Sequence, residues 1–93
     1  MLEIGVLMQK IEPGAVTNLC GKRVKLARVN KDMNQLQLAV ALNIDYGIDV
    51  NQYSISQLER GSRFVKDYEL VAISEVLEVD VKWLLFGDKV PVM

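Results

Sequence analysis

Apolar residues recur along the chain at the spacing of amphipathic helices, in which positions three and four apart share a face. Polar residues that suit helix N-caps stand before several of the apolar runs, and glycines follow some of them. This pattern predicts five short helices, at residues 18–31, 35–42, 52–60, 68–77 and 81–86. The expected fold is therefore all-α, a compact five-helix domain.

Four side chains are the predicted N-caps, because their oxygens can accept hydrogen bonds from backbone N–H groups of a first turn. They are Asn34, Asn51, Asp67 and Asp80, and Gly61 and Gly87 are placed just past the ends of the third and fifth helices. The stretch from Asn43 to Val50 contains Gly47 and two aspartates, and it is predicted to be a loop.

The same periodicity predicts which side chains face inward. The inner positions of the first three helices are Cys20, Val24, Ala27, Leu38, Ala39, Leu42, Ile55 and Leu58. The apolar positions of the fourth are Leu70, Val71, Ile73, Val76 and Leu77. The run Trp83-Leu84-Leu85-Phe86 is assigned to the core rather than to a dimer seam, because aromatic side chains carry much of the area that cores bury.

The 93 residues suffice for one domain, expected at residues 18–87, with a tail or arm at 1–17 and a short tail at 88–93. Residues Met1 to Val16 are mostly apolar and contain the turn signal Pro13-Gly14 near their end. They could form a partner-facing arm, a short helix on the core or sequence outside the domain. They lack the basic start and cleavage pattern of a signal peptide, and no apolar run could span a bilayer, so a cytoplasmic protein is expected.

The net charge is −1, but basic and acidic residues are unevenly distributed along the chain. Residues 20–66 hold eight basic and four acidic side chains, a net charge of +4, whereas residues 67–93 hold two basic and six acidic ones, a net charge of −4. This separation suits a protein that places one face on a polyanion.

Few residues of the kinds that carry catalysis are present. The chain has no histidine, a single cysteine and no glycine-rich phosphate loop, so nucleophile–base pairs and metal-ligand spacings are missing. Cys20 has no histidine to activate it and is interpreted as a small buried apolar residue. We therefore expect no enzyme activity, no cofactor and no metal site.

The most informative stretch runs from Asn34 to Gly61, where two short helices, each opened by an asparagine, follow one another. In a helix-turn-helix, the second helix reads base edges and the first crosses the backbone. Amide and hydroxyl groups suit base edges, so the candidate base contacts are Gln52, Tyr53, Ser56 and Gln57. Gln35 begins the first of the two helices, where its amide and the helix N-terminus can bind a phosphate together.

Several blocks over about three quarters of the chain are together typical of one family. They are Gly21-Lys22-Arg23-Val24 with Arg28, Asn34-Gln35 with Leu38-Ala39 and Leu42, Ile55 to Gly61, Tyr68 to Ile73, and Leu77 to Gly87. In these blocks the chain resembles the Cro/repressor helix-turn-helix domains of phage repressors and the xenobiotic-response-element family of bacterial regulators.

The resemblance implies the phosphate role of Gln35 and base contacts by Gln52, Tyr53 and Gln57. It further implies that Ser62, Arg63 and Lys66 lie near the DNA backbone, and Asn51 is placed with these backbone contacts. Arg28 and Glu59 resemble the family's ion pair, which ties the first helix to the third.

One departure from the family pattern is the longer connection between the second and third helices, which inserts residues at about Asp45 to Val50. The insert is expected either to lengthen the second helix or to change how the third helix is presented.

The resemblance implies a transcriptional regulator of prokaryotic or phage type, a repressor that binds a double-stranded DNA operator. A single module makes few base contacts, so a homodimer on an inverted repeat is expected, with its dimer surface at the N-terminal tail or the apolar C-terminal end. No membrane partner or small-molecule effector is expected. The alternatives are an antitoxin that represses its own operon and a protein-interaction module that uses this fold without DNA.

Overall fold

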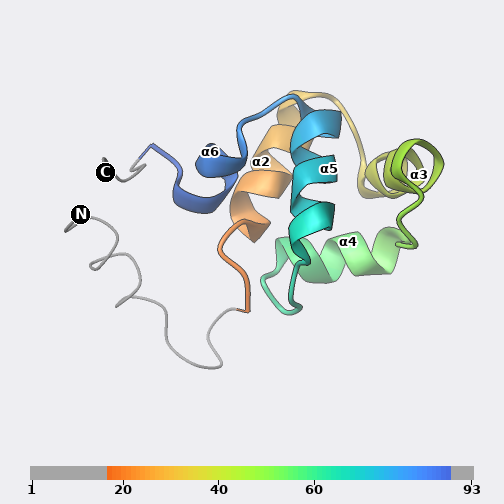
Figure 1. The fold of residues 1–93 in the computed structure, drawn as a ribbon, viewed down its shortest axis with the longest axis horizontal. Coiled ribbons are helices and arrows are strands. Elements are labelled where there is room, and N and C mark those ends of the chain that lie inside the picture. The colour runs from red at the N-terminus through yellow and green to blue at the C-terminus, as the bar shows by residue number, and fades with distance from the viewer. Residues whose placement is uncertain (1–16, 89–93) are drawn as a thin grey trace.

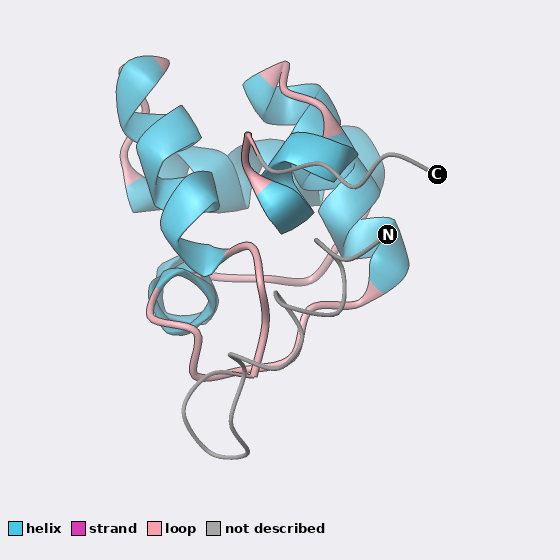
Figure 2. Ribbon diagram, turned by 90° about the vertical axis from the view of Figure 1, so that its left-hand side faces the viewer, coloured by secondary structure: helices cyan, strands magenta, loops and turns pink. Residues whose placement is uncertain are grey.

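The computed structural model describes residues 17–88, which form five helices and no strand (Figures 1 and 2). The helices are α2 (Gly21–Asn30), α3 (Gln35–Tyr46), α4 (Gln52–Glu59), α5 (Asp67–Leu77) and α6 (Val81–Phe86). This confirms the all-α, five-helix prediction. The expected N-terminal arm, apart from Thr17, and the C-terminal tail beyond Asp88 lie outside the described residues. No helix among residues 17–88 is long and apolar enough to cross a membrane.

Three of the predicted N-caps have the expected geometry. Asn34 Oδ1 accepts from the backbone N–H of Gln37 at 2.7 Å, and Gln37 Oε1 accepts from the backbone N–H of Asn34 at 2.8 Å. Asn51 Oδ1 accepts from the Ser54 N–H at 2.8 Å, and Asp80 Oδ1 from the Lys82 N–H at 2.8 Å. Each bond satisfies a first-turn donor that has no acceptor within its own helix.

Two predicted helix starts are wrong by one to three residues. The first helix begins at Gly21 rather than Asn18, because the Asn18 side chain stays outside it and accepts from the N–H groups of Cys20 and Gly21. The fourth helix includes Asp67, and its N-cap is Lys66. Asp67 lies in the first turn, where a carboxylate interacts favourably with the helix dipole.

The predicted loop from Asn43 to Val50 is wrong in its first half, because α3 continues to Tyr46. Nothing in Asn43 to Tyr46 breaks a helix, and Gly47 ends it by adopting a left-handed conformation with φ 66°. Asn43 Nδ2 donates to the carbonyl oxygens of Ala39 and Val50, so one side chain joins the helix to the loop that follows. Of the extra residues, Asp45 and Tyr46 therefore lengthen α3, and residues 47–50 lengthen the connection to α4.

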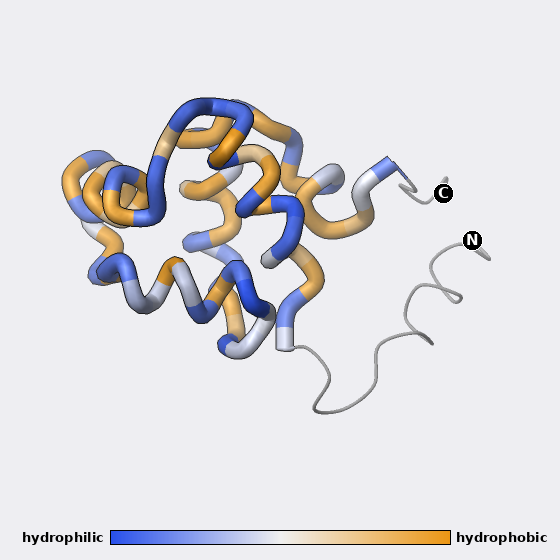
Figure 3. The backbone as a smooth tube through the Cα atoms, turned by 180° about the vertical axis from the view of Figure 1, so that it is seen from behind, coloured by the Kyte–Doolittle hydropathy of each residue, from blue (hydrophilic) through white to orange (hydrophobic). Residues whose placement is uncertain are grey.

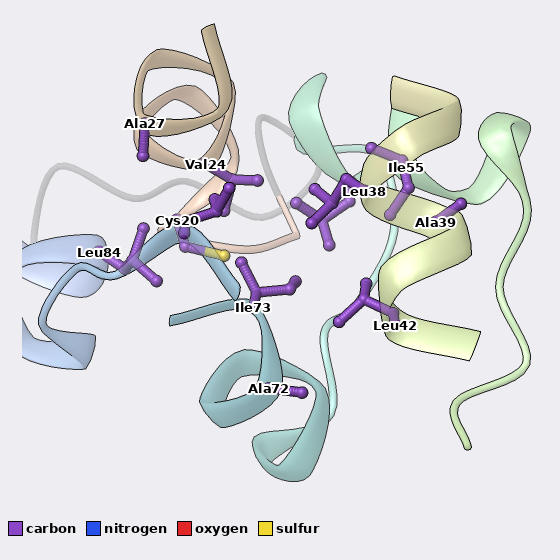
Figure 4. Close-up of a cluster of buried hydrophobic side chains, with 12 residues drawn as sticks. Cys20, Val24, Ala27, Leu38, Ala39, Leu42, Ile55, Ala72, Ile73 and Leu84 are labelled. Atoms are coloured by element: carbon purple, nitrogen blue, oxygen red, sulfur yellow. The ribbon is translucent and has the colours of Figure 1, made fainter. Parts of the chain in front are cut away.

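The core lies where the helices meet and is shown in Figure 4. All eight inner positions predicted for the first three helices are buried. In α5 the buried face holds Ala72, Ile73 and Leu77, so Val71 falls on the opposite side and is exposed. Leu84 of the last helix is fully buried, while Trp83 packs half-buried against the core.

Helix α4 lies along one edge of the domain, beside α2 and α3 (Figure 1). Ile55 and Leu58 anchor it in the core. Its C-terminal end approaches α2 so closely that a Cβ on Gly21 would lie 2.4 Å from the Leu58 carbonyl oxygen and 2.9 Å from that of Glu59. These contacts fix one face of α4 inward and leave the other outward.

Gly21→Ala is expected to lower the free energy of unfolding by about 1–3 kcal/mol, because backbone atoms must move to admit the methyl group. The matched control is Gly47→Asn, which meets open space at a left-handed position that asparagine tolerates, and it should cost under about 1 kcal/mol. Urea unfolding followed by circular dichroism measures both changes. Equal stability of the Gly21 variant and the unmodified protein would contradict the close helix contact.

Burial raises the pKa of the Cys20 thiol from 9.0 to about 11. The folded protein therefore holds the thiol proton more tightly than the unfolded chain does. The resulting stability is fully present below pH 9 and is lost as the pH rises through about 11. Native protein at pH 8 should react with iodoacetamide far more slowly than urea-unfolded protein, as measured by mass spectrometry. Equal rates would contradict the burial of Cys20.

Candidate nucleic-acid interface

The outward face of α4 is polar. Gln52 and Tyr53 are exposed, with 64% of Tyr53 accessible, and Ser56 and Gln57 are half-buried on the same helix. Figure 3 shows mainly hydrophilic colours along α4, with hydrophobic colour at its apolar positions. The helix carries no acid before Glu59, and Glu59 is buried. This arrangement presents amide and hydroxyl groups, which can read base edges, on a narrow helical ridge.

The N-terminal ends of α3 and α4 border one shallow depression in the surface. Its lining residues are Gln35, Leu36, Asn51, Gln52, Tyr53 and Ser56. The first N–H groups of each helix have no acceptor within that helix, so two sets of backbone donors adjoin this depression. Donors of this kind, together with the positive ends of two helix dipoles, favour an anion.

The connection from Gly47 to Val50 lies on another side of α4. With Ser54 of α4 and the loop that follows α4, it lines a separate pocket that also includes Phe64, Lys66 and Tyr68. The side chains of Gln52 and Tyr53 line the depression beside α3 instead. The longer connection therefore leaves the outward face of α4 uncovered.

Arg28 and Glu59, expected to pair, form a buried two-pronged ion pair. Arg28 Nε lies 2.6 Å from Glu59 Oε2, and Arg28 Nη2 lies 3.0 Å from Glu59 Oε1. Each residue is 7% exposed. The hydrogen bonds to Glu59 raise the pKa of the Arg28 guanidinium above its ordinary value. The pair joins α2 to the end of α4.

The Arg63 side chain forms several hydrogen bonds within the protein. Its guanidinium donates to the Ser54 carbonyl at 2.8 Å, to the Phe64 carbonyl at 3.0 Å, and to both carboxylate oxygens of the buried Glu69 at 3.0 and 2.7 Å. The side chain thus links α4 to α5, and Glu69 neutralises its charge. This arrangement favours a structural role for Arg63 over the expected phosphate contact.

The other residues expected to contact the DNA backbone differ in whether their side chains already bond within the protein. Asn51 uses its side-chain oxygen as the cap of α4. Ser62 is exposed and donates through Oγ to the Gln57 carbonyl at 3.1 Å. Lys66 is exposed, with its Nζ 5.8 Å from the centre of the Tyr68 ring. Lys66 thus combines exposure with a positive charge that remains accessible to a phosphate.

Arg60 is a basic residue of this surface that the sequence reasoning missed. It follows α4 directly, is exposed, and donates through Nη1 to Ser56 Oγ at 2.7 Å. Its spacing of four from Ser56 was the available signal, since residues four apart share a helix face. Arg60 also lines a small cleft with Lys22 and Arg23 of α2, so three basic residues border this cleft at the C-terminal end of α4.

The chain is similar to the HTH-type transcriptional regulator DicA of Escherichia coli strain K12. The two are 38% identical over 69 residues, which are 74% of this chain and 47% of DicA. The chain thus spans about half the length of this curated relative. No family model matches the chain, so membership of the Cro/repressor family stays a prediction. No solved structure matches it either.

Proposed function

We propose that this domain binds double-stranded DNA and regulates transcription, with α4 in the major groove and the start of α3 against the backbone. The observation that carries the proposal is the position of α4. Its apolar side packs in the core, while its polar side faces outward beside the N-terminus of α3. This is how a helix-turn-helix presents its reading helix. The similarity to DicA, named as an HTH-type transcriptional regulator, supports the same function.

Sequence would be read by four side chains of α4. Gln52 and Gln57 can each pair with adenine through two hydrogen bonds, and Tyr53 can contact a thymine methyl group. Ser56 Oγ, which already accepts from Arg60, keeps its own proton to donate to a base. These contacts lie along the first two turns of α4, the part of a reading helix that reaches base edges.

Phosphates would be held by residues around the reading helix. Gln35 and Asn51 border the depression between the helix ends, and Ser62 and Lys66 lie on the loop after α4. Arg60 joins this group because it is exposed and basic. Each neutralised phosphate steepens the loss of affinity with salt.

The domain would act as a repressor and bind as a homodimer to an inverted repeat, because one copy of α4 makes few base contacts.

We place the folded unit at residues 18–87, as the sequence suggests. Directly before this unit, the backbone N–H and Oγ of Thr17 both donate to the Gly61 carbonyl, at 2.8 and 2.9 Å. Thr17 therefore lies beside the loop that follows α4.

The test is fluorescence anisotropy of a labelled random-sequence duplex at 50 and 200 mM salt. We expect binding at the lower salt and a loss of about tenfold or more at the higher, from counterion release. Lys66→Ala should reduce the slope of log affinity against log salt concentration by the amount expected for about one phosphate contact. The distant Lys82→Ala should leave this slope unchanged. No binding of the unmodified protein at low salt would overturn the proposal.

A second candidate, a protein-interaction module, is favoured by one observation. Leu36, Val40 and Ile44 recur every four residues along α3 and are all exposed, which leaves an apolar stripe on that helix. The duplex experiment separates the two candidates, because a protein-interaction module without a DNA role would not bind random duplex at low salt.

A further inference from the structure

The carboxylate of Glu59 sits where α2, α3 and α4 meet. Besides the two bonds from Arg28, its Oε1 accepts from Gln35 Nε2 at 3.0 Å. Gln35 begins α3 and also borders the depression between the helix ends. One buried carboxylate therefore holds the side chain that lies at the candidate phosphate position.

This bond restricts the Gln35 amide. The amide is planar, so fixing one of its N–H groups on a buried acceptor limits the orientation of the whole group. Its second N–H and its oxygen remain for a partner outside. Without the bond, a glutamine at a helix start would sample several rotamers, and binding would have to restrict them.

Arg28 makes this arrangement compatible with an anion. An unpaired carboxylate beneath the depression would repel a phosphate, but the two bonds from Arg28 neutralise the charge of Glu59. Arg28 Nη1 also donates to the Met33 carbonyl at 2.8 Å, directly before the Asn34 cap. The same guanidinium thus fixes both the carboxylate and the chain that leads into α3.

We propose that Glu59 is a positioning residue that presents the Gln35 amide to a DNA phosphate, with Arg28 neutralising Glu59. The proposal rests on the proposed DNA-binding function. It assigns to the Arg28–Glu59 pair a part in affinity in addition to its structural role. Pre-organising one side chain before binding is expected to contribute about two- to tenfold in affinity.

The experiment removes the bond without leaving a buried charge. Arg28→Met and Glu59→Met together replace the ion pair by apolar side chains, a change that folded domains often tolerate. Gln35→Ala is then introduced into the unmodified protein and into this double variant, and duplex affinity is measured for all four at low salt. Lys66→Ala in both backgrounds is the matched control, because it removes a phosphate contact that does not touch Glu59.

We expect Gln35→Ala to weaken binding about two- to tenfold in the unmodified protein and by clearly less in the double variant. Lys66→Ala should cost the same in both. An equal cost of Gln35→Ala in both backgrounds would overturn the positioning role while leaving DNA binding intact. Absence of duplex binding by the unmodified protein would instead overturn the proposed function, and the positioning role with it.

A second measurement needs no DNA and applies even if the double variant is less stable. In ¹⁵N NMR spectra, the Gln35 side-chain amide should be displaced from the positions of exposed glutamines and rigid on the nanosecond timescale. In the double variant, which has no acceptor at position 59, it should move toward those positions and become mobile. A Gln35 amide that is equally mobile in the unmodified protein would overturn the proposal.

Discussion

Arg28→Met alone is expected to lower the free energy of unfolding by about 3–5 kcal/mol, because it leaves the Glu59 carboxylate buried without its partner. Small domains have about 5–15 kcal/mol in total, so this variant should be close to unfolding. The double variant Arg28→Met with Glu59→Met should recover most of the loss, because no uncompensated charge remains. Urea unfolding followed by circular dichroism measures all three proteins.

The control for this prediction is the exposed ion pair between Lys31 and Glu78, which lie 2.5 Å apart. Lys31→Met should change stability by only about 0–1 kcal/mol, because solvent screens a surface pair. If Arg28→Met lowered the free energy of unfolding no more than Lys31→Met does, burial would not explain the contribution of the Arg28–Glu59 pair to stability. A double variant no more stable than Arg28→Met would show that the loss has another cause, such as the freed Met33 carbonyl.

Gln52→Ala combined with Gln57→Ala is expected to remove most of the preference for a selected operator over random duplex. Each two-bond contact of an amide with adenine contributes about 1–3 kcal/mol of discrimination, so losing both should cost about tenfold or more. Binding to random duplex should change much less, since phosphates dominate it. Competition binding on an operator obtained by in vitro selection measures the two affinities side by side.

Asn30→Ala is the control for this pair, because it removes an exposed amide from the far end of α2. It should leave both affinities unchanged. Thermal unfolding of each variant checks that the fold is intact, as expected for substitutions outside the core. An unchanged operator preference in the double glutamine variant would refute the assigned reading face of α4.

Local sequence signals predicted most of the fold, because they act within one helical turn. Asn34, Asn51 and Asp80 cap the helices they were expected to cap, and Ile55 and Leu58 face inward. The end of α3 was missed because Gly47 alone stops the helix, while the aspartates around it had suggested a longer loop.

The contacts that define the candidate site were less predictable, because they join residues far apart in the chain. The Arg28–Glu59 pair was expected only through the family resemblance. The bond between Gln35 and Glu59 spans 24 positions and has no local signature. Likewise, Arg63 resembles a free basic residue in the sequence, and only the fold places Glu69 and the Ser54 carbonyl around its guanidinium.

The most direct test of α4 as the DNA-reading helix is an NMR titration of the ¹⁵N-labelled chain with a short duplex at low salt. The account predicts that the largest amide shifts fall on Gln35 and on residues 51–57, with smaller ones at Arg60 and Lys66. Shifts confined to α5 and α6, or an unchanged spectrum at saturating duplex, would contradict it.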